Sequence, residues 1–219
     1  MLQLLFGLLS LIAVSSSSNA EDLKKVPVRL TPDAGLQFKL PYTLGTHEGK
    51  VQELNDGWVI FDSTGTRIHE IHISFQVRQL KTGNAELECH LREAIELDYR
   101  ESQFPKSQVC KDNELPQSGP NSSRYPLIEF HARPDLLIPL SASNSPSVLE
   151  FSGTLSIHGK SQQRKILLKV ERKTSEGFIP VSGQFQVNLA DHGIQVKPFL
   201  FIKVKDTATV FFDLQVQAP

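Results

Sequence analysis

The chain has 219 residues, with 23 basic and 24 acidic side chains and a formal net charge of -1. A nearly neutral chain without a long basic run is not typical of nucleic-acid-binding proteins, so we expect no nucleic-acid partner. Apolar residues make up 39% of the sequence, which is enough for one domain of barrel or sandwich size.

The first twenty residues have the pattern of a signal peptide. The apolar block at 4–14 is too short to span a bilayer, which requires about 20 residues. Ser18-Asn19-Ala20 then offers a small-x-small cleavage site, although no Lys or Arg precedes the apolar block. We therefore expect a signal peptide over 1–20, a single mature domain over 21–219, and a periplasmic or secreted protein.

Short segments of alternating apolar and polar residues dominate the mature chain. Such alternation is typical of strands with one buried face. Alternating segments lie at 36–40, 71–78, 85–89, 151–158, 181–189 and 208–216. Short apolar runs at 58–61 and 166–170 and the segment 127–132 are also expected to be strands. Within the hairpin at 151–170, the polar residues 160–163 are expected to form the connection. A Gly- and charge-rich passage occupies 45–57.

The apolar spacing changes at Leu91. Leu91, Ile95 and Tyr99 recur every four residues, which predicts one short helix that ends before Pro105. The following stretch, 106–124, is long for a connection in a compact domain, and such loops are usually functional or disordered. About eight or nine strands, one helix and no βαβ alternation predict an antiparallel barrel or sandwich.

Several motifs resemble the YceI family of lipocalin-like bacterial proteins. The hairpin carries G-x-L-x-I-H-G at 153–159, and His90-Leu91 precedes the predicted helix. Y-P-L-I-E-F stands at 125–130, F-x-V-x-x-x-D-x-G-I at 185–194, and V-K-D-x-x-x-V-x-x-x-L at 204–214. The landmarks keep the family's order over residues 87–216, whereas the N-terminal third is similar only in pattern.

The resemblance implies an all-β fold, a lipocalin-like antiparallel β-barrel of about eight strands with one short α-helix. It also implies binding of an isoprenoid, a quinone or a similar amphiphilic lipid, and relatives that can pair as homodimers. An eight-stranded barrel is just wide enough either to fill with its own side chains or to hold one small ligand. The candidate ligand-binding residues lie on the apolar faces of the alternating segments: Phe38, Phe75, Phe130, Phe151, Leu155, Phe185 and Phe212.

Two other functions remain open beside the lipid carrier. One is a structural or interaction module whose barrel is filled by its own side chains. The other is a redox accessory protein that binds a quinone or a metal-bound partner. A solvent extract of the purified protein would separate the first alternative from the carrier, and a visible absorption spectrum would address the second.

The sequence does not indicate an enzyme. It contains no Gly-x-Ser-x-Gly elbow and no phosphate-binding glycine loop, so we expect no catalytic residues and no cofactor. His69 and His72 resemble a metal pair, but residues three apart on a strand face opposite sides, so no metal site is expected. His158, at the hairpin tip, is expected to make a turn-stabilising hydrogen bond or to contact a ligand.

Cys89 and Cys110 are the two cysteines of the chain. An even number of cysteines in an exported protein favours a disulfide, which would join a strand end to the loop beyond the predicted helix. In the chain-entropy model, closing a loop of this size contributes roughly 3 kcal/mol.

Overall fold

The computed structural model describes residues 22–84, 87–88, 125–134, 136–137, 146–194 and 203–219. Its strands are β1 (Lys24–Leu30), β2 (Leu36–Tyr42), β3 (Gly45–Val51), β4 (Asp56–Phe61), β5 (Arg67–Gln76), β6 (Leu80–Lys81), β7 (Leu127–Ala132), β8 (Leu136–Leu137), β9 (Ser147–Ile157), β10 (Lys160–Val170), β11 (Phe178–Asn188) and β12 (Thr207–Gln217). Two 3-10 helices, η1 (Val77–Gln79) and η2 (Ala190–His192), are also present. Across these residues, no helix has the length and apolar character needed to cross a bilayer.

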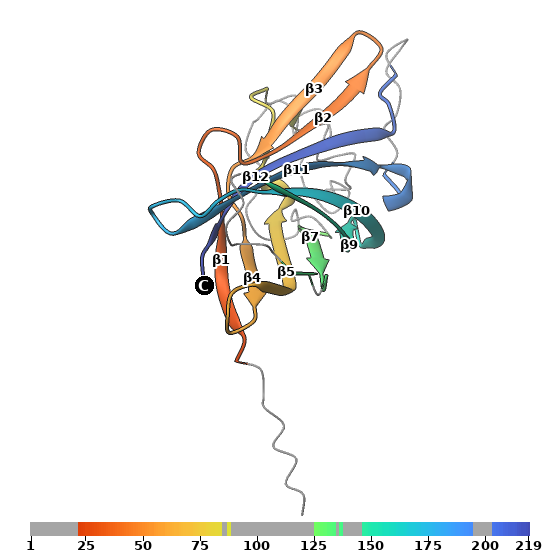
Figure 1. The fold of residues 1–219 in the computed structure, drawn as a ribbon. Coiled ribbons are helices and arrows are strands. Elements are labelled where there is room, and N and C mark those ends of the chain that lie inside the picture. The colour runs from red at the N-terminus through yellow and green to blue at the C-terminus, as the bar shows by residue number, and fades with distance from the viewer. Residues whose placement is uncertain (1–21, 85–86, 89–124, 135, 138–145, 195–202) are drawn as a thin grey trace, which may run out of the picture.

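Eight strands form the wall of a closed antiparallel barrel. They pair in the order β1-β4-β5-β7-β9-β10-β11-β12, and β12 pairs back with β1 (Figure 1). Closure removes the open edges that would otherwise expose unpaired backbone groups. The predicted all-β, lipocalin-like barrel of about eight strands is therefore confirmed.

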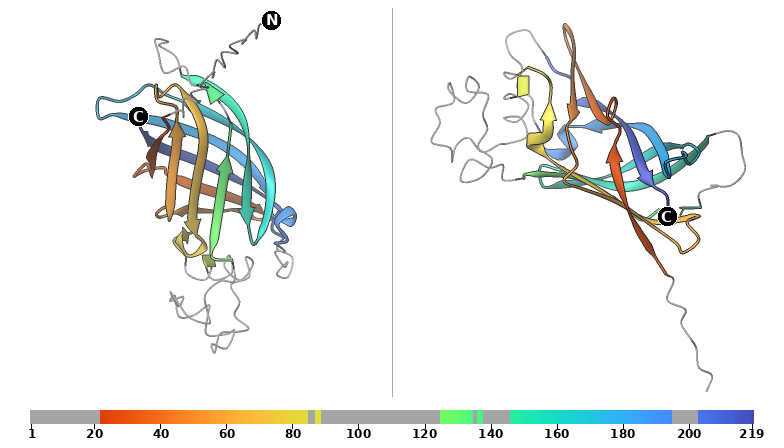
Figure 2. Two further views of the ribbon diagram at one scale, coloured as in Figure 1. Left: turned by 90° about the horizontal axis from the view of Figure 1, so that it is seen from below. Right: turned by 90° about the vertical axis from the view of Figure 1, so that its left-hand side faces the viewer.

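The strand β12 is shared between two neighbours. Its C-terminal part pairs with β1, and residues 209–212 pair with β2. The β2–β3 hairpin projects beyond the barrel wall, and β3 pairs with β6 (Figures 1 and 2). Since β6 directly follows β5 and η1 in the chain, the β2–β3 hairpin is connected to the barrel wall through β6 as well as through β12.

Alternation along each wall strand places one face inside the barrel. In β12, Ala208, Phe212, Leu214 and Val216 are buried and partly buried Val210 packs against the interior, while the alternate residues face outward. In β10, Ile166, Leu168 and Val170 are buried in the same way. Burying this apolar surface stabilises the fold by about 25 cal/mol for each Å² removed from water.

The hairpin turn between β9 and β10 is shorter than predicted. Strand β10 begins at Lys160, so the polar residues 160–163 belong to a strand and pair with β9. The turn itself consists of His158 and Gly159, with φ angles of 55° and 69°. Positive φ at both central residues is the geometry of a two-residue turn that matches the twist of the flanking strands.

The strand predicted over 85–89 is wrong where the structure describes it, because Leu87 and Glu88 are helical. The Asn84 side chain accepts a hydrogen bond from the Leu87 amide at 2.9 Å, as in a helix N-cap. The Glu88 carboxylate accepts the amides of Thr82 and Gly83 at 3.0 and 3.2 Å. Local side-chain hydrogen bonds therefore favour a helical backbone at Leu87 and Glu88.

Two further boundaries differ from the sequence prediction. The strand predicted to run through Val77 ends at Gln76, since Val77 begins η1 and is buried there. The Gly- and charge-rich passage at 45–57 supplies the whole of β3. The signal peptide, the helix from Leu91, the loop at 106–124 and the Cys89–Cys110 disulfide fall outside the described residues.

Candidate ligand-binding site

Buried apolar side chains of the barrel strands, together with residues of β3, η1, β6 and the segment after η2, form two clusters. The Phe61 cluster consists of Val26, Val28, Val59, Phe61, Ile68, Ile71, Ala132, Phe151, Ile166, Leu168, Val170, Ile179, Val181, Phe212, Leu214 and Val216. The Phe75 cluster consists of Val51, Phe75, Val77, Leu80, Ile128, Leu155, Ile157, Val187 and Ile194. A ligand inside such a wall would meet almost only hydrocarbon, which suits an apolar chain.

The structure brings the seven predicted ligand-binding residues to this interior. Phe151 and Phe212 belong to the Phe61 cluster, and Phe75 and Leu155 belong to the Phe75 cluster. The remaining three are partly buried and pack against the clusters. They are Phe38, which packs against the Phe75 cluster, and Phe130 and Phe185, which pack against both.

Two aromatic pairs join these residues. The rings of Phe130 and Phe151 are 6.2 Å apart, centroid to centroid, and meet edge to face. Those of Phe185 and Phe212 are 6.4 Å apart. Such pairs contribute about 0.5–1.5 kcal/mol beyond the stabilisation that comes from burying apolar surface. The contacts fix the rings as part of the barrel wall, whether the space between them holds a ligand or is filled by side chains.

Three of the six candidate phenylalanine rings lie over glycines on the neighbouring strand. Phe38 covers Gly49, Phe130 covers Gly153, and Phe212 covers Gly183. A Cβ atom on any of these glycines would overlap the ring above it. Sequence reasoning missed these pairings, although a glycine inside an alternating strand signals a close approach by another group.

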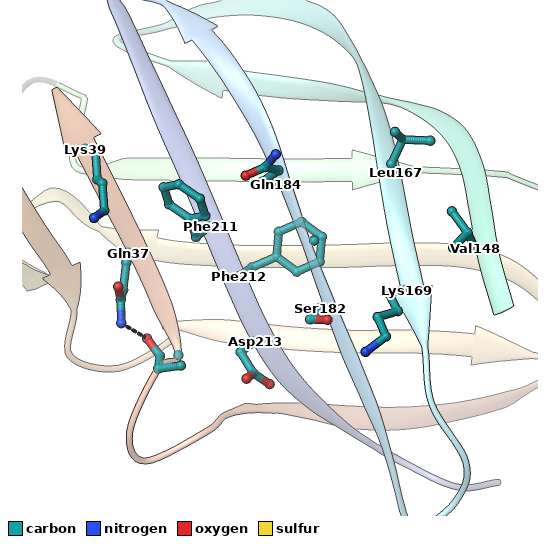
Figure 3. Close-up of a pocket in the computed structure, with 13 residues that line it drawn as sticks. Gln37, Lys39, Val148, Leu167, Lys169, Ser182, Gln184, Phe211, Phe212 and Asp213 are labelled. Atoms are coloured by element: carbon teal, nitrogen blue, oxygen red, sulfur yellow. Dashed lines mark hydrogen bonds between the residues drawn. The ribbon is translucent and has the colours of Figure 1, made fainter. Parts of the chain in front are cut away.

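A recess lies on the outer face of the barrel, across β2, β9, β10, β11 and β12 (Figure 3). This groove has a volume of 660 Å³. Its lining consists of Ala34, Gly35, Gln37, Lys39, Val148, Leu167, Lys169, Ser182, Gly183, Gln184, Phe211, Phe212 and Asp213. Val148 and Leu167 are 69% and 55% exposed, so the groove offers apolar surface to solvent. It lies outside the barrel and is not the predicted internal cavity.

The tip of the β9–β10 hairpin is joined to η2 by buried polar groups. The His158 ring donates from Nδ1 to the His192 carbonyl at 3.2 Å, so the predicted stabilising hydrogen bond reaches η2 from the turn. Fully buried His192 donates from Nδ1 to the Lys160 carbonyl at 3.0 Å. Arg164 donates to His192 Nε2 at 3.4 Å and to the Asp191 carboxylate at 3.0 Å.

This arrangement requires a neutral His192. A carbonyl can only accept and a guanidinium can only donate, so Nδ1 carries the proton and Nε2 is the acceptor. Burial, together with the positive charge of Arg164, lowers the pKa of His192, while the Lys160 carbonyl and the Asp191 carboxylate oppose the shift. A second proton would place an N–H group against Arg164.

The free energy of unfolding is therefore expected to fall as the pH drops below about 6.5, the ordinary pKa of histidine. In that range the unfolded chain binds a proton that native His192 resists, and one such proton changes stability by at most about 1.4 kcal/mol per pH unit. Urea unfolding at pH 5 to 8 would measure this slope. His192→Gln should reduce it, because glutamine can donate and accept at the same positions without titrating. A residual slope is expected from His47, whose pKa burial also lowers.

His69 and His72 lie in an irregular part of β5, where it pairs with β4. Among the residues that the structure describes, no group of three or more His, Cys, Asp or Glu side chains is placed to hold a metal ion. The register of β4 and β5 shifts so that Ile60 pairs with Glu70 and Phe61 with Ile68, which leaves His69 as the extra residue of a β-bulge.

Comparison with known proteins gives a consistent family. The model of the YceI-like domain matches residues 33–216. A polyisoprenoid binding domain from Saccharophagus degradans, implicated in plant cell wall breakdown, has a TM-score of 0.60 and 15% identity, covering 89% of this chain and 99% of that one. Burkholderia cenocepacia BcnA has a TM-score of 0.56 and 12% identity, with coverages of 86% and 95%. No curated protein matches this chain.

A third solved structure is the YceI protein of Campylobacter jejuni. It has a TM-score of 0.51 and 11% identity, covering 81% of this chain and 88% of that chain. At these identities the three structures establish the shared fold, and the family match over 33–216 rests on the sequence itself.

Proposed function

Because this chain belongs to the YceI-like domain family, we propose that it binds an isoprenoid, a quinone or a similar amphiphilic lipid inside its barrel. It acts as a non-catalytic carrier or binder. The observation that supports this proposal most directly is the closed barrel with seven large apolar candidates gathered on its inner side. The description of the Saccharophagus degradans domain as polyisoprenoid binding agrees with it.

The energetics of such binding are favourable. Each CH₂ group moved from water into an apolar site contributes about 0.8 kcal/mol, so a few prenyl units offset the entropic cost of association. Hydrocarbon contact has no direction, so the length of the site would select among ligands more than their chemistry. The amphiphile's polar end would remain at the mouth of the barrel, where water is available.

Mass spectrometry of a solvent extract from the purified native protein tests this function. The extract is expected to contain a prenylated or otherwise long-chain lipid at up to one molecule per chain. An extract without lipid, together with failure to take up added polyprenol, would overturn the proposed carrier function. The alternative of a structural or interaction module with a filled barrel would then remain. A visible chromophore that remains with the protein would instead support the redox accessory function.

We also propose that the protein acts after export. The short apolar segment at 4–14 and the small residues before Glu21 support removal of the first twenty residues. N-terminal sequencing of the protein from the periplasmic fraction should begin at Glu21, and a chain that still began with Met1 would contradict export by cleavage.

Replacing Leu155 by phenylalanine is expected to weaken binding of long prenyl chains more than that of short ones. Leu155 lies in the Phe75 cluster and is 4% exposed, so the larger ring must take space inside the barrel. We expect an affinity loss of about tenfold for a long chain, equivalent to about 1.4 kcal/mol. Titration with fluorescent prenyl probes of two lengths would measure the difference.

Leu167→Phe is the matched control. Leu167 also lies in the hairpin, but on the outer face of β10, where it is 55% exposed. It should leave both affinities unchanged. Equal losses for long and short chains in the Leu155 variant would show that the change acts through folding and not through the length of the site.

A further inference from the structure

Three aromatic side chains form a row across the outer face of the barrel. Trp58 on β4 pairs directly with His72 on β5, and His72 pairs directly with His131 on β7. The Trp58 and His72 rings are stacked with centroids 5.1 Å apart, and the His72 and His131 centroids are 6.4 Å apart. Directly opposed residues on antiparallel strands have Cβ atoms about 4.5–5.5 Å apart, so the two imidazoles are held as near neighbours.

Neighbouring carboxylates orient this pair. The Glu70 carboxylate lies 2.6 Å from His131 Nε2, and Arg133 lies 3.6 Å from the other carboxylate oxygen. A carboxylate accepts hydrogen bonds, so His131 donates from Nε2 and keeps the lone pair of Nδ1. A carboxylate–histidine contact of this kind is the usual support behind a metal-binding imidazole.

His72 is supported on two sides. Trp58 stacks on its ring, and the Asp56 carboxylate lies 3.8 Å from its Nε2. Asp56 is itself held by a hydrogen bond of 2.9 Å from the Trp58 indole nitrogen. The side chains of His72 and His131 are 20% and 42% exposed, so an ion can reach them from solvent.

The spacing of the two rings suits a shared ion. With metal–nitrogen distances of about 2.0–2.1 Å, each ring centroid lies about 3.2 Å from the metal. Two such rings can therefore be up to about 6.4 Å apart, and they are about 5 Å apart at tetrahedral angles. The observed separation is at this upper limit, and a modest turn of the more exposed His131 shortens it.

We propose that His72 and His131 form a binding site for a divalent transition-metal ion, with copper(II) preferred, on the outer face of β5 and β7. Two imidazoles supply the protein ligands and water completes the shell, since no third described ligand joins them. Imidazole favours copper, nickel and zinc over magnesium and calcium, and copper(II) stands highest in the affinity order. The site is separate from the barrel interior, so it does not depend on lipid binding.

The single tryptophan of the chain provides a direct test. Because Trp58 stacks on His72, copper(II) bound at this site should quench its fluorescence saturably at one equivalent. His72→Gln and His131→Gln should each raise the copper(II) concentration needed for half-maximal quenching at least tenfold. His47→Gln, on β3 and stacked on Tyr42, is the matched control and should leave the titration unchanged.

Electron paramagnetic resonance of the wild-type protein loaded with one equivalent of copper(II) gives a second, variant-independent measurement. Hyperfine coupling to two nitrogen ligands is expected, and Glu70→Ala should weaken copper binding about 10- to 100-fold by freeing the His131 ring. Circular dichroism would verify that each variant is folded. Quenching that does not saturate, or saturable quenching that persists unchanged in both histidine variants, would overturn the proposal.

Discussion

Replacing Phe61 by alanine is expected to lower the free energy of unfolding by about 3–5 kcal/mol. Phe61 ends β4, is 1% exposed and lies within the larger apolar cluster. Its neighbours belong to strands fixed by pairing on both sides, so they cannot collapse into the space that the ring leaves. The substitution therefore loses both the transfer free energy of the ring and the contacts of the residues around it.

Urea unfolding followed by circular dichroism would measure the loss, and Leu44→Ala is its control. Leu44 is 66% exposed in the turn between β2 and β3, so removing its side chain should change stability by less than about 0.5 kcal/mol. A loss below about 1 kcal/mol for Phe61→Ala would mean that this end of the barrel is not closely packed.

The barrel could be predicted from sequence because each of its long wall strands has one buried, apolar face and one face that points outward. In β12 every second residue from Ala208 to Val216 faces the interior. These inward positions are apolar, so apolar and other residues alternate along the sequence. Strand β3 carries no such signal. Among its residues only Val51 is buried, so its polar and glycine residues do not distinguish a strand from a loop.

The first half of β10 was missed for a related reason. Residues 160–165 are all polar, although β9 residues opposite them include buried Leu155 and Ile157. Gln162 and Arg164 instead donate hydrogen bonds to residues of η2. Pairing with β9 holds the backbone in a strand there, and this pairing leaves no hydrophobic period. Local sequence reasoning therefore placed the turn too late.

In the candidate site, too, some features follow from the residues of a single strand and others depend on how strands pair. Alternation alone places the seven apolar candidates inside, because the inward face of a strand is defined by its own residues. Contacts between strands need the register. The Phe212 ring over Gly183 depends on strand pairing, and His72 and His131 become neighbours only because β5 and β7 pair across the intervening residues. No spacing within a single segment could have indicated that histidine pair.

The pairing of Phe212 with Gly183 leads to a second large effect. Gly183→Ala is expected to destabilise the protein by about 2–3 kcal/mol, near the upper part of the range for overpacked interiors. The new Cβ atom would overlap the Phe212 ring and also the backbone carbonyl oxygen of Leu167 on β10. The ring could turn aside, but the carbonyl is held in the β10–β11 pairing and cannot move without disturbing it.

Two comparisons isolate this cause. Ser182→Ala changes the adjacent residue on the outer face of β11 and should alter stability by less than about 0.5 kcal/mol. Gly153→Ala should cost less than Gly183→Ala, because the three atoms nearest to its new Cβ all belong to the side chains of Phe130 and Ala132. Urea unfolding of the three variants would rank them. If the Gly183→Ala variant were as stable as the original protein, the better strand propensity of alanine would outweigh the overlap. The close approach of β10 to β11 would then not be the reason for a glycine at this position.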